Sequence, residues 1–185
     1  VCSSDLNHAT DCKNIFFTMG MEIERKFLVR SNSFKKEAAQ ALGTDGDAGT
    51  LYRQGYIPTA NGMTVRIRIA GQKGYVTLKD RSVGFSRHEF EYEIPADDAQ
   101  QMLELMCIKP QIEKHRYVVP SATKPLKWEV DVFHGDNEGL VVAEIEVPSE
   151  DTEFELPDWI DKEVTGDRRY NNSHLIDNPY KNWRT

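Results

Sequence analysis

The most constraining feature of this sequence is a set of short segments in which charged and apolar residues alternate. The first is M-E-I-E-R-K-F-L-V at residues 21–29. Its charged residues Glu22, Glu24 and Lys26 alternate with the apolar residues Met21, Ile23 and Phe27. A period of two residues is typical of a β-strand with one polar and one apolar face. Two carboxylates and an ammonium therefore share one face of this predicted strand. On a single strand, such a charged face usually points to water.

Similar segments recur along the chain, and the sign of the charge on the polar face varies between them. The charged residues on these faces are Glu22, Glu24, Lys26, Arg66, Arg68, Lys79, Arg87, Glu89, Glu91, Lys114, Arg116, Asp131, Glu144 and Glu146. The segments predict about eight strands. Short turns such as T-A-N-G and G-Q-K-G join most of them, which favours antiparallel pairing.

Four other segments predict helices. Residues 31–42 form a short helix that Ser31 or Ser33 caps and Gly43 ends. Residues 96–107 form an amphipathic helix. The predicted apolar stripe of this second helix consists of Met102, Leu103, Leu105 and Met106, and Cys107 is expected in the core. Short helices are also expected at 150–154 and 167–178. Trp128 and Trp159 are expected to pack helices against the sheet.

Composition limits the possible classes of protein. The chain has 185 residues, enough for one domain with a real core, and its net charge of −7 argues against a general nucleic-acid binder. No segment approaches the roughly 20 apolar residues of a membrane span. The three cysteines form no C-x-x-C pair, which argues against zinc and favours a reducing, cytoplasmic setting. We expect a disordered leader or added segment at 1–20, one domain at 21–178 and an exposed tail at 179–185.

The charged faces allow two arrangements. In an open sheet or a small filled barrel, the apolar faces point inward and the charges meet water. In a closed barrel, the charged faces can line a polar tunnel while helices cover the apolar outer faces. Buried charges must then be paired, bound to metal or matched by a charged ligand. Many basic residues beside many carboxylates suit a polyphosphate with Mg²⁺ or Mn²⁺.

These motifs, taken in order, resemble the signature of the CYTH domain, the triphosphate tunnel metalloenzymes. The matching pieces are E-x-E-x-K at 22–26, R-Q-G-Y at 53–56, V-R-I-R at 65–68, T-L-K at 77–79, S-R-H-E-F-E at 86–91, E-K-H-R-Y at 113–117, W-E-V-D-V-F at 128–133, A-E-I-E-V at 143–147 and E-V-T-G-D-R-R-Y at 163–170. The resemblance spans nearly all of residues 21–178. It is greatest to the short bacterial branch of inorganic triphosphatases.

The resemblance implies an all-β-dominated α+β fold, an eight-stranded antiparallel closed β-barrel with helices packed outside. It implies metal-dependent hydrolysis of inorganic triphosphate, with Lys26, Tyr56 and Glu24 as catalytic residues. The substrate-binding residues would be Lys26, Arg66, Arg68, Lys79, Arg87, Lys114 and Arg116. The Mg²⁺ or Mn²⁺ ligands would be Glu22, Glu24, Asp131, Glu144 and Glu146. Glu89 and Glu91 would either join the metal or orient basic residues, and Tyr56 would alternatively fill the barrel.

Three other functions remain open from the residues alone. A class IV-type adenylate cyclase uses the same metals but needs a purine site, and a thiamine triphosphatase needs an aromatic platform. A non-catalytic polyphosphate-binding module is the alternative outside the enzymes. The expected partner is a small-molecule triphosphate, with neither nucleic acid nor membrane, and the expected assembly is a monomer or a homodimer.

Overall fold

The computed structural model describes residues 23–60, 62–80 and 88–183. The predicted site residues Glu22 and Arg87, and the predicted leader at 1–20, lie outside the described residues. The strands are β1 (Ile23–Val29), β2 (Thr50–Ile57), β3 (Thr64–Ala70), β4 (Lys73–Lys79), β5 (Glu89–Ile94), β6 (Ile112–Pro120), β7 (Lys127–Phe133), β8 (Val141–Val147) and β9 (Ile160–Glu163). The α-helices are α1 (Phe34–Leu42), α2 (Ala96–Leu105) and α3 (Asn172–Asp177).

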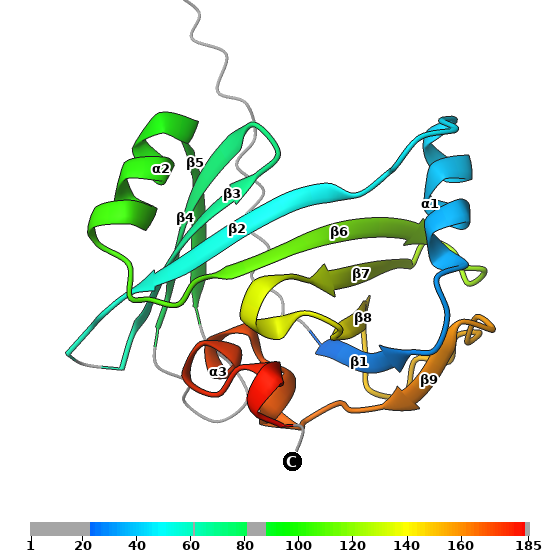
Figure 1. Cartoon of the computed structure of the whole chain (residues 1–185). Helices are drawn as coiled ribbons and strands as arrows, with labels where there is room; N and C mark the ends of the chain where they lie inside the picture. The colour runs from blue at the N-terminus through cyan, green and yellow to red at the C-terminus, as the bar shows by residue number, and fades with distance from the viewer. Residues whose placement is uncertain (1–22, 61, 81–87, 184–185) are drawn as a thin grey trace, which may run out of the picture.

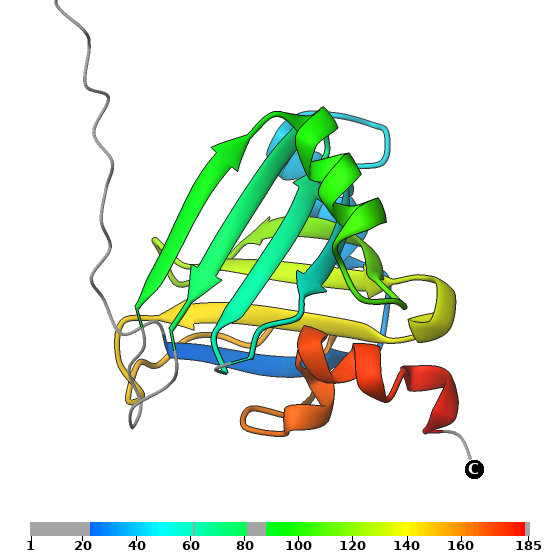
Figure 2. The same ribbon diagram turned by 90° about the vertical axis from the view of Figure 1, so that its left-hand side faces the viewer.

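The strands form one curved antiparallel sheet in the order β5-β4-β3-β2-β6-β7-β8-β1-β9 (Figures 1 and 2). The predicted set of strands is therefore confirmed, with β9 as a ninth that the pattern missed. Its sequence, I-D-K-E, has one apolar residue and no alternation. Among the described residues, hydrogen bonds do not close this sheet, since β5 and β9 are its two ends.

Helix α1 covers the apolar outer face of one half of the sheet. Its buried Phe34 makes edge-to-face contacts with Tyr117 on β6 at 5.4 Å and with Trp159 at 5.9 Å between ring centroids. Trp128 and Trp159 are buried in the same core, as the sequence predicts. Gly43 ends the helix with a φ of 65°, a backbone conformation that glycine adopts without strain.

Helix α2 covers the outer face of the other half, over β2, β3 and β4 (Figure 1). Its buried residues are Ala99 and Leu103, which pack against Ile67. The predicted apolar stripe is wrong for Leu105 and Met106, which are 78% and 55% exposed, because the helix ends there and its buried side passes through Ala99 instead. Cys107 is buried as predicted.

The C-terminal segment packs against an apolar layer at one end of the inner face. Leu175 and Ile176 of α3 are buried with Ile112, Phe133 and Val142, which extend the inward-facing positions of β6, β7 and β8. The helix prediction for 167–178 is therefore confirmed, with a 3₁₀ turn at Arg168–Tyr170 preceding α3.

Two predictions for peripheral segments are wrong. Residues 150–154 form no helix. Of the predicted exposed tail at 179–185, the described residues 179–183 are only partly exposed, because the rings of Tyr180 and Trp183 contact each other edge to face at 5.2 Å and pack partly buried against the α3 layer. Aromatic side chains can bury a large apolar surface even in a segment whose other residues are polar.

Candidate functional site

The charged sides of the strands share the inner face of the curved sheet, opposite α1 and α2. They form two groups that we name by their charge balance. The acidic cluster, from β1, β6, β7 and β8, contains Glu24, Lys26, Lys114, Arg116, Glu129, Asp131 and Glu144. The basic cluster, from β3, β4 and β5, contains Arg66, Arg68, Thr77, Lys79, Glu89 and Glu91.

Lys26 joins two carboxylates of the acidic cluster. Its ammonium donates to Glu24 at 2.8 Å and to Glu144, its partner in the β1–β8 register. Burial lowers the pKa of Lys26, but the two carboxylates outweigh it and raise that pKa above its usual value. For Glu144, burial raises the pKa, but the positive charges of Lys26, Lys114 and Arg116 outweigh burial and lower that pKa to about 2. Both groups are therefore held in their charged forms.

Asp131 holds two basic residues in the interior of the acidic cluster. Lys114 is 1% exposed and donates to Asp131, and Arg116 donates to both oxygens of Asp131 at 2.7 and 2.6 Å. Arg116 also reaches Glu144 at 3.2 Å and pairs with Glu129. Burial lowers the pKa of Lys114 despite the favourable Asp131 charge. The bonds of Asp131 favour an orienting role, and the metal role predicted for it stays a prediction.

Two carboxylates at one end of the acidic cluster are more open. Glu24 lies opposite Glu146 in the β1–β8 register; its side chain is 45% exposed, and Glu146 is also exposed. Partial burial and the neighbouring Glu144 carboxylate raise the pKa of Glu24, against the effect of Lys26. This repulsion between carboxylates is what a divalent cation would relieve.

The exposed carboxylates of Glu24 and Glu146 fit a hard cation such as Mg²⁺ in their chemistry. The oxygens of Glu144 bind Lys26 and Arg116, so the metal role predicted for Glu144 stays a prediction. Mg²⁺ usually takes one or two protein carboxylates, several waters and the phosphates of a substrate. Accordingly, within residues 23–60, 62–80 and 88–183, no three acidic, histidine or cysteine side chains form a complete metal-binding group. The carboxylates present suit a metal that the substrate helps to bind.

The basic cluster contains hydrogen-bond donors that have no acceptor among the described residues. Arg66 and Arg68 donate to Glu91 at 3.1 and 2.9 Å, and Lys79 pairs with Glu89 at 2.6 Å. Both glutamates therefore lie where the orienting role would place them, and the metal role left open for them stays a prediction. The Nε atoms of Arg66 and Arg68 are buried, and neither has a hydrogen-bond partner in the described part of the chain. Such donors favour an anionic ligand, because an unmade bond at a buried polar group is costly.

Tyr52 and Gln54 of β2 lie between the two clusters. The Tyr52 ring lies under both Arg68 and Arg116, with guanidinium carbons 5.5 and 5.3 Å from its centre. Gln54 is 1% exposed and donates to the Tyr56 hydroxyl at 3.2 Å. Only the shared strand face could have indicated them, since neither residue type is by itself diagnostic of a site.

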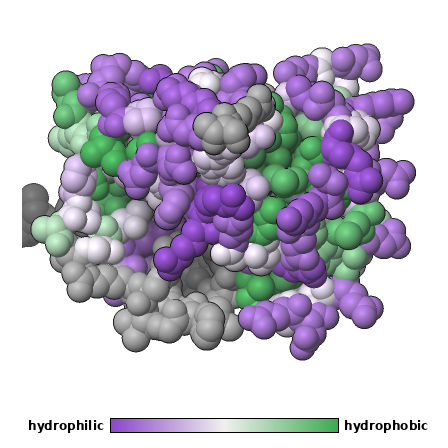
Figure 3. Space-filling model, turned by 60° about the horizontal axis from the view of Figure 1, so that its bottom comes forward, coloured by the Kyte–Doolittle hydropathy of each residue, from purple (hydrophilic) through white to green (hydrophobic). Residues whose placement is uncertain are grey.

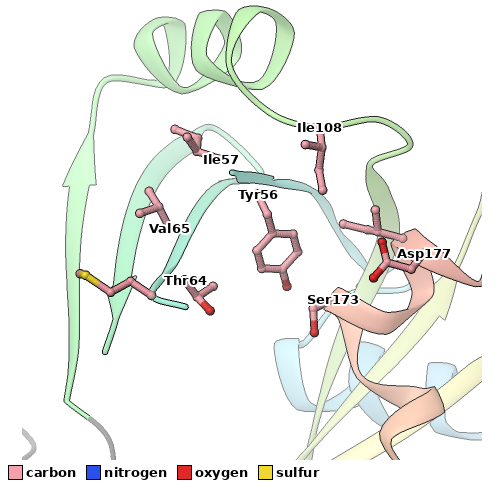
Figure 4. A pocket seen from close by; sticks show the side chains of 9 residues that line it. Tyr56, Ile57, Thr64, Val65, Ile108, Ser173 and Asp177 are labelled. Carbon is pink, nitrogen blue, oxygen red and sulfur yellow. The ribbon is translucent and has the colours of Figure 1, made fainter. Parts of the chain in front are cut away.

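A cavity of about 180 Å³ adjoins Tyr56, between the ends of β2 and β3 and helix α3. In Figure 4 the Tyr56 ring points into it, toward Ser173 and Thr64. Ligand pockets for drug-sized molecules usually measure about 300–1,000 Å³. The cavity is therefore smaller than a usual ligand pocket.

Other features of the surface lie apart from the two clusters. The face in Figure 3 is mostly hydrophilic, with hydrophobic residues gathered in patches on either side. His115 and His134 face each other at 2.7 Å between ring nitrogens. Among the described residues, none of the helices has the length and apolar character to cross a membrane.

Comparisons with known proteins agree with this geometry. The CYTH domain model matches residues 20–174. An inorganic triphosphatase of Acetivibrio thermocellus is 51% identical over 166 residues, covering 90% of this chain and 99% of that protein. An inorganic triphosphatase of Nitrosomonas europaea is 36% identical over 158 residues, covering 83% and 95%.

A solved structure agrees as well. The crystal structure of the inorganic triphosphatase NE1496 is similar with a TM-score of 0.59 and 33% identity, covering 84% of this chain and 93% of that chain. The matched family model and these relatives confirm the resemblance drawn from the strand motifs. The chain belongs to the CYTH domain family.

Proposed function

We propose that this protein hydrolyses inorganic triphosphate to pyrophosphate and phosphate on the polar inner face of its sheet, with Mg²⁺ or Mn²⁺ as cofactor. The observation that carries the proposal is the pairing of an acidic cluster with a basic cluster on the inner face of one curved sheet. The two relatives, 51% and 36% identical and named inorganic triphosphatases, support the same reaction. A divalent metal would balance the carboxylates of the acidic cluster, and the triphosphate would balance the cations of the basic cluster.

The substrate would lie across both clusters. The basic side chains facing it are Lys26, Arg66, Arg68, Lys79, Lys114 and Arg116, and Arg87 is proposed with them from its place in the motif. The unpartnered Nε atoms of Arg66 and Arg68 would donate to phosphate oxygens. Glu91 orients these two guanidinium groups in the absence of substrate, so less conformational freedom is lost on binding.

Glu24, Glu144 and Glu146 would hold the metal, together with Glu22 by its place in the motif. A bound Mg²⁺ or Mn²⁺ neutralises phosphate charge and favours attack on phosphorus. Asp131 would contribute by fixing Lys114 and Arg116, as its bonds indicate. Metal binding by Asp131 or by Glu144 would require their bonds to basic residues to rearrange.

The residues proposed for catalysis act by holding charge and moving protons. Lys26 would keep its ammonium beside the developing charge, because Glu24 and Glu144 stabilise its protonated form. Glu24, whose pKa is raised by partial burial and by Glu144, would accept the proton of the attacking water. Tyr56, whose hydroxyl accepts a bond from Gln54, would steady the leaving phosphate.

The proposal includes three finer points. The curvature of the sheet supports a barrel-like enclosure of the inner face, and we propose that this enclosed form binds the substrate. We also propose a cytoplasmic protein that acts as a monomer or a homodimer. The domain boundaries proposed are 21–178, close to the matched residues 20–174.

The test is a phosphate-release assay with tripolyphosphate, ATP and thiamine triphosphate, each with and without Mg²⁺ or Mn²⁺, alongside an assay for cyclic AMP. We expect metal-dependent release from tripolyphosphate that exceeds release from both other substrates. Cyclic AMP as the main product would replace the proposal with a cyclase, and preferred release from thiamine triphosphate would replace it with a thiamine triphosphatase. Tight binding of tripolyphosphate without turnover would indicate a binding module.

A further inference from the structure

The motif E-V-T-G-D-R-R-Y at 163–170 has no role in the function proposed above. It begins at the last residue of β9, which pairs with the outer edge of β1. Phe27 lies opposite Glu163 and Val29 opposite Ile160, and the register shifts between these two pairs. The motif therefore runs beside Lys26 on the side away from β8.

The motif holds both backbone groups of Lys26. The backbone N–H of Val164 donates to the Lys26 carbonyl at 2.8 Å, and the Lys26 N–H donates to the Thr165 hydroxyl oxygen at 3.0 Å. The Thr165 hydroxyl in turn donates to Glu163 at 2.7 Å. Arg25 binds Glu163 through two bonds of 2.8 and 2.7 Å. The hydroxyl is thereby fixed between a donor and an acceptor.

A side-chain hydroxyl, and not a backbone carbonyl, accepts the Lys26 N–H because the backbone of the motif turns away from the sheet. The Val164 carbonyl accepts from the Asp167 N–H at 3.0 Å, and Gly166 has a φ of 79°, so the chain turns after Thr165. A backbone carbonyl on a longer β9 would otherwise accept the Lys26 N–H. The threonine hydroxyl substitutes for that carbonyl at the point where the edge strand ends.

We infer that Thr165 is a positioning residue for Lys26, which fixes the strand backbone so that the lysine side chain extends between Glu24 and Glu144. The inference rests on the proposed function for its effect on turnover. The β1–β8 register presents the Lys26 side chain to Glu144 from the inner face. A shift in the backbone at Lys26 would move its ammonium away from the phosphate chain, and small displacements of catalytic groups are costly.

The experiment compares Thr165→Val with Thr165→Ser in the full chain. Valine keeps the shape but removes the hydroxyl, and serine keeps the hydroxyl. We expect Thr165→Val to lower kcat for tripolyphosphate about tenfold with KM changed less than about twofold, since the other basic residues still bind the substrate. Thr165→Ser should restore kcat to near the wild-type value. Equal kcat in Thr165→Val and wild type would overturn the inference.

The matched control is Thr152→Val. The Thr152 hydroxyl also accepts a backbone N–H, that of Ser149 at 3.1 Å, in an exposed turn outside the two clusters. This variant should keep wild-type kcat and KM. An equal loss of kcat in Thr152→Val and Thr165→Val would also overturn the inference, because it would show that the loss is not specific to Lys26.

Amide hydrogen exchange at Lys26, measured by NMR, separates this inference from the proposed function. In the wild type we expect a protected Lys26 amide, and in Thr165→Val an amide that exchanges about tenfold faster. If the wild type fails to hydrolyse tripolyphosphate, the proposed function fails while the exchange data still test the contact. Rapid exchange at Lys26 in the wild type would overturn the inference, even if Thr165→Val does not fold.

Discussion

The acidic and basic clusters are built from the same alternating strand pattern but differ in charge balance. The acidic cluster combines four carboxylates with three basic residues, whereas the basic cluster combines two carboxylates with three basic residues. Two guanidinium nitrogens of the basic cluster also lack partners within the described residues. One half of the inner face is thus suited to a cation and the other to an anion, which is the combination that a metal-bound polyphosphate requires.

The two halves of the inner face also differ in how deeply their strands are packed into the protein. The acidic cluster lies on central strands whose outer faces form the large core under α1, and Lys114 and Asp131 are both 1% exposed. The basic cluster takes its carboxylates from β5, an edge strand whose residues are nearly all exposed. Buried networks rigidify a structure, while edges with few packed neighbours open more easily. We therefore expect the acidic half to be pre-organised and the basic half to adapt to the substrate.

Removal of divalent metal should have the largest effect and test the cation-binding half directly. Excess EDTA should reduce phosphate release from tripolyphosphate by at least about 1,000-fold, because the substrate charge and the carboxylates of the acidic cluster would then repel each other. Adding Mg²⁺ or Mn²⁺ in excess should restore the rate. Turnover that persists in chelator would contradict the assignment of Glu24, Glu144 and Glu146.

Lys26→Ala should lower kcat for tripolyphosphate by about 100- to 1,000-fold, since it removes a buried cation from the acidic half. The matched control is Lys127→Ala, which removes an exposed lysine that pairs with Glu129 at 3.0 Å. Steady-state kinetics of the two variants would separate a local role from a general loss of positive charge. Equal rates in both variants would argue against any catalytic role for Lys26.

Glu144→Gln should destabilise the protein by about 3 kcal/mol near pH 7, because it removes the charge of a buried carboxylate that binds Lys26 and Arg116. The folded-state pKa of Glu144 is about 2, below an unfolded value of about 4.3. The stability it contributes is therefore present above about pH 4.3 and is lost as the pH falls toward 2. Urea unfolding across this range should show a smaller acid-dependent loss in Glu144→Gln than in the wild type. Glu150→Gln, in an exposed turn, should behave as the wild type does.

Arg68→Lys should have the smallest effect and test the anion-binding half. Lysine keeps the charge but loses the planar guanidinium that donates to Glu91 and offers a free Nε. We expect KM for tripolyphosphate to rise about tenfold with kcat within about threefold of the wild type. Lys73→Ala, which removes an exposed lysine paired with Glu93, is the control. A fall in kcat without a change in KM would contradict the assignment of Arg68 to substrate binding.

The sequence predicted the faces of the strands better than the ends of the elements. Glu24 and Lys26 stand two residues apart on a predicted strand, so their shared face could be predicted before any fold was known. Strand β9 could not be found, because Ile160–Glu163 lacks alternation and is held mainly by its pairing with β1. Likewise, the exposure of Leu105 depends on where α2 ends, which tertiary packing decides.

The sequence also could not predict which side chains pair with one another within the site. The family resemblance implied Asp131 as a metal ligand, yet cross-strand register sets it opposite Arg116, and its oxygens accept hydrogen bonds from that residue and from Lys114. The contact of Thr165 with Lys26 likewise depends on the turn at Gly166. Register and turn geometry are long-range outcomes that a local period does not specify.

The most direct test of the account is a crystal structure of the protein with tripolyphosphate and Mn²⁺, located by anomalous scattering. We predict a manganese peak beside Glu24, Glu144 and Glu146, with phosphate oxygens within hydrogen-bonding distance of Arg66 and Arg68. Manganese and phosphate on the outer faces beneath α1 or α2, or phosphate bound on the inner face with no metal at the acidic cluster, would contradict it.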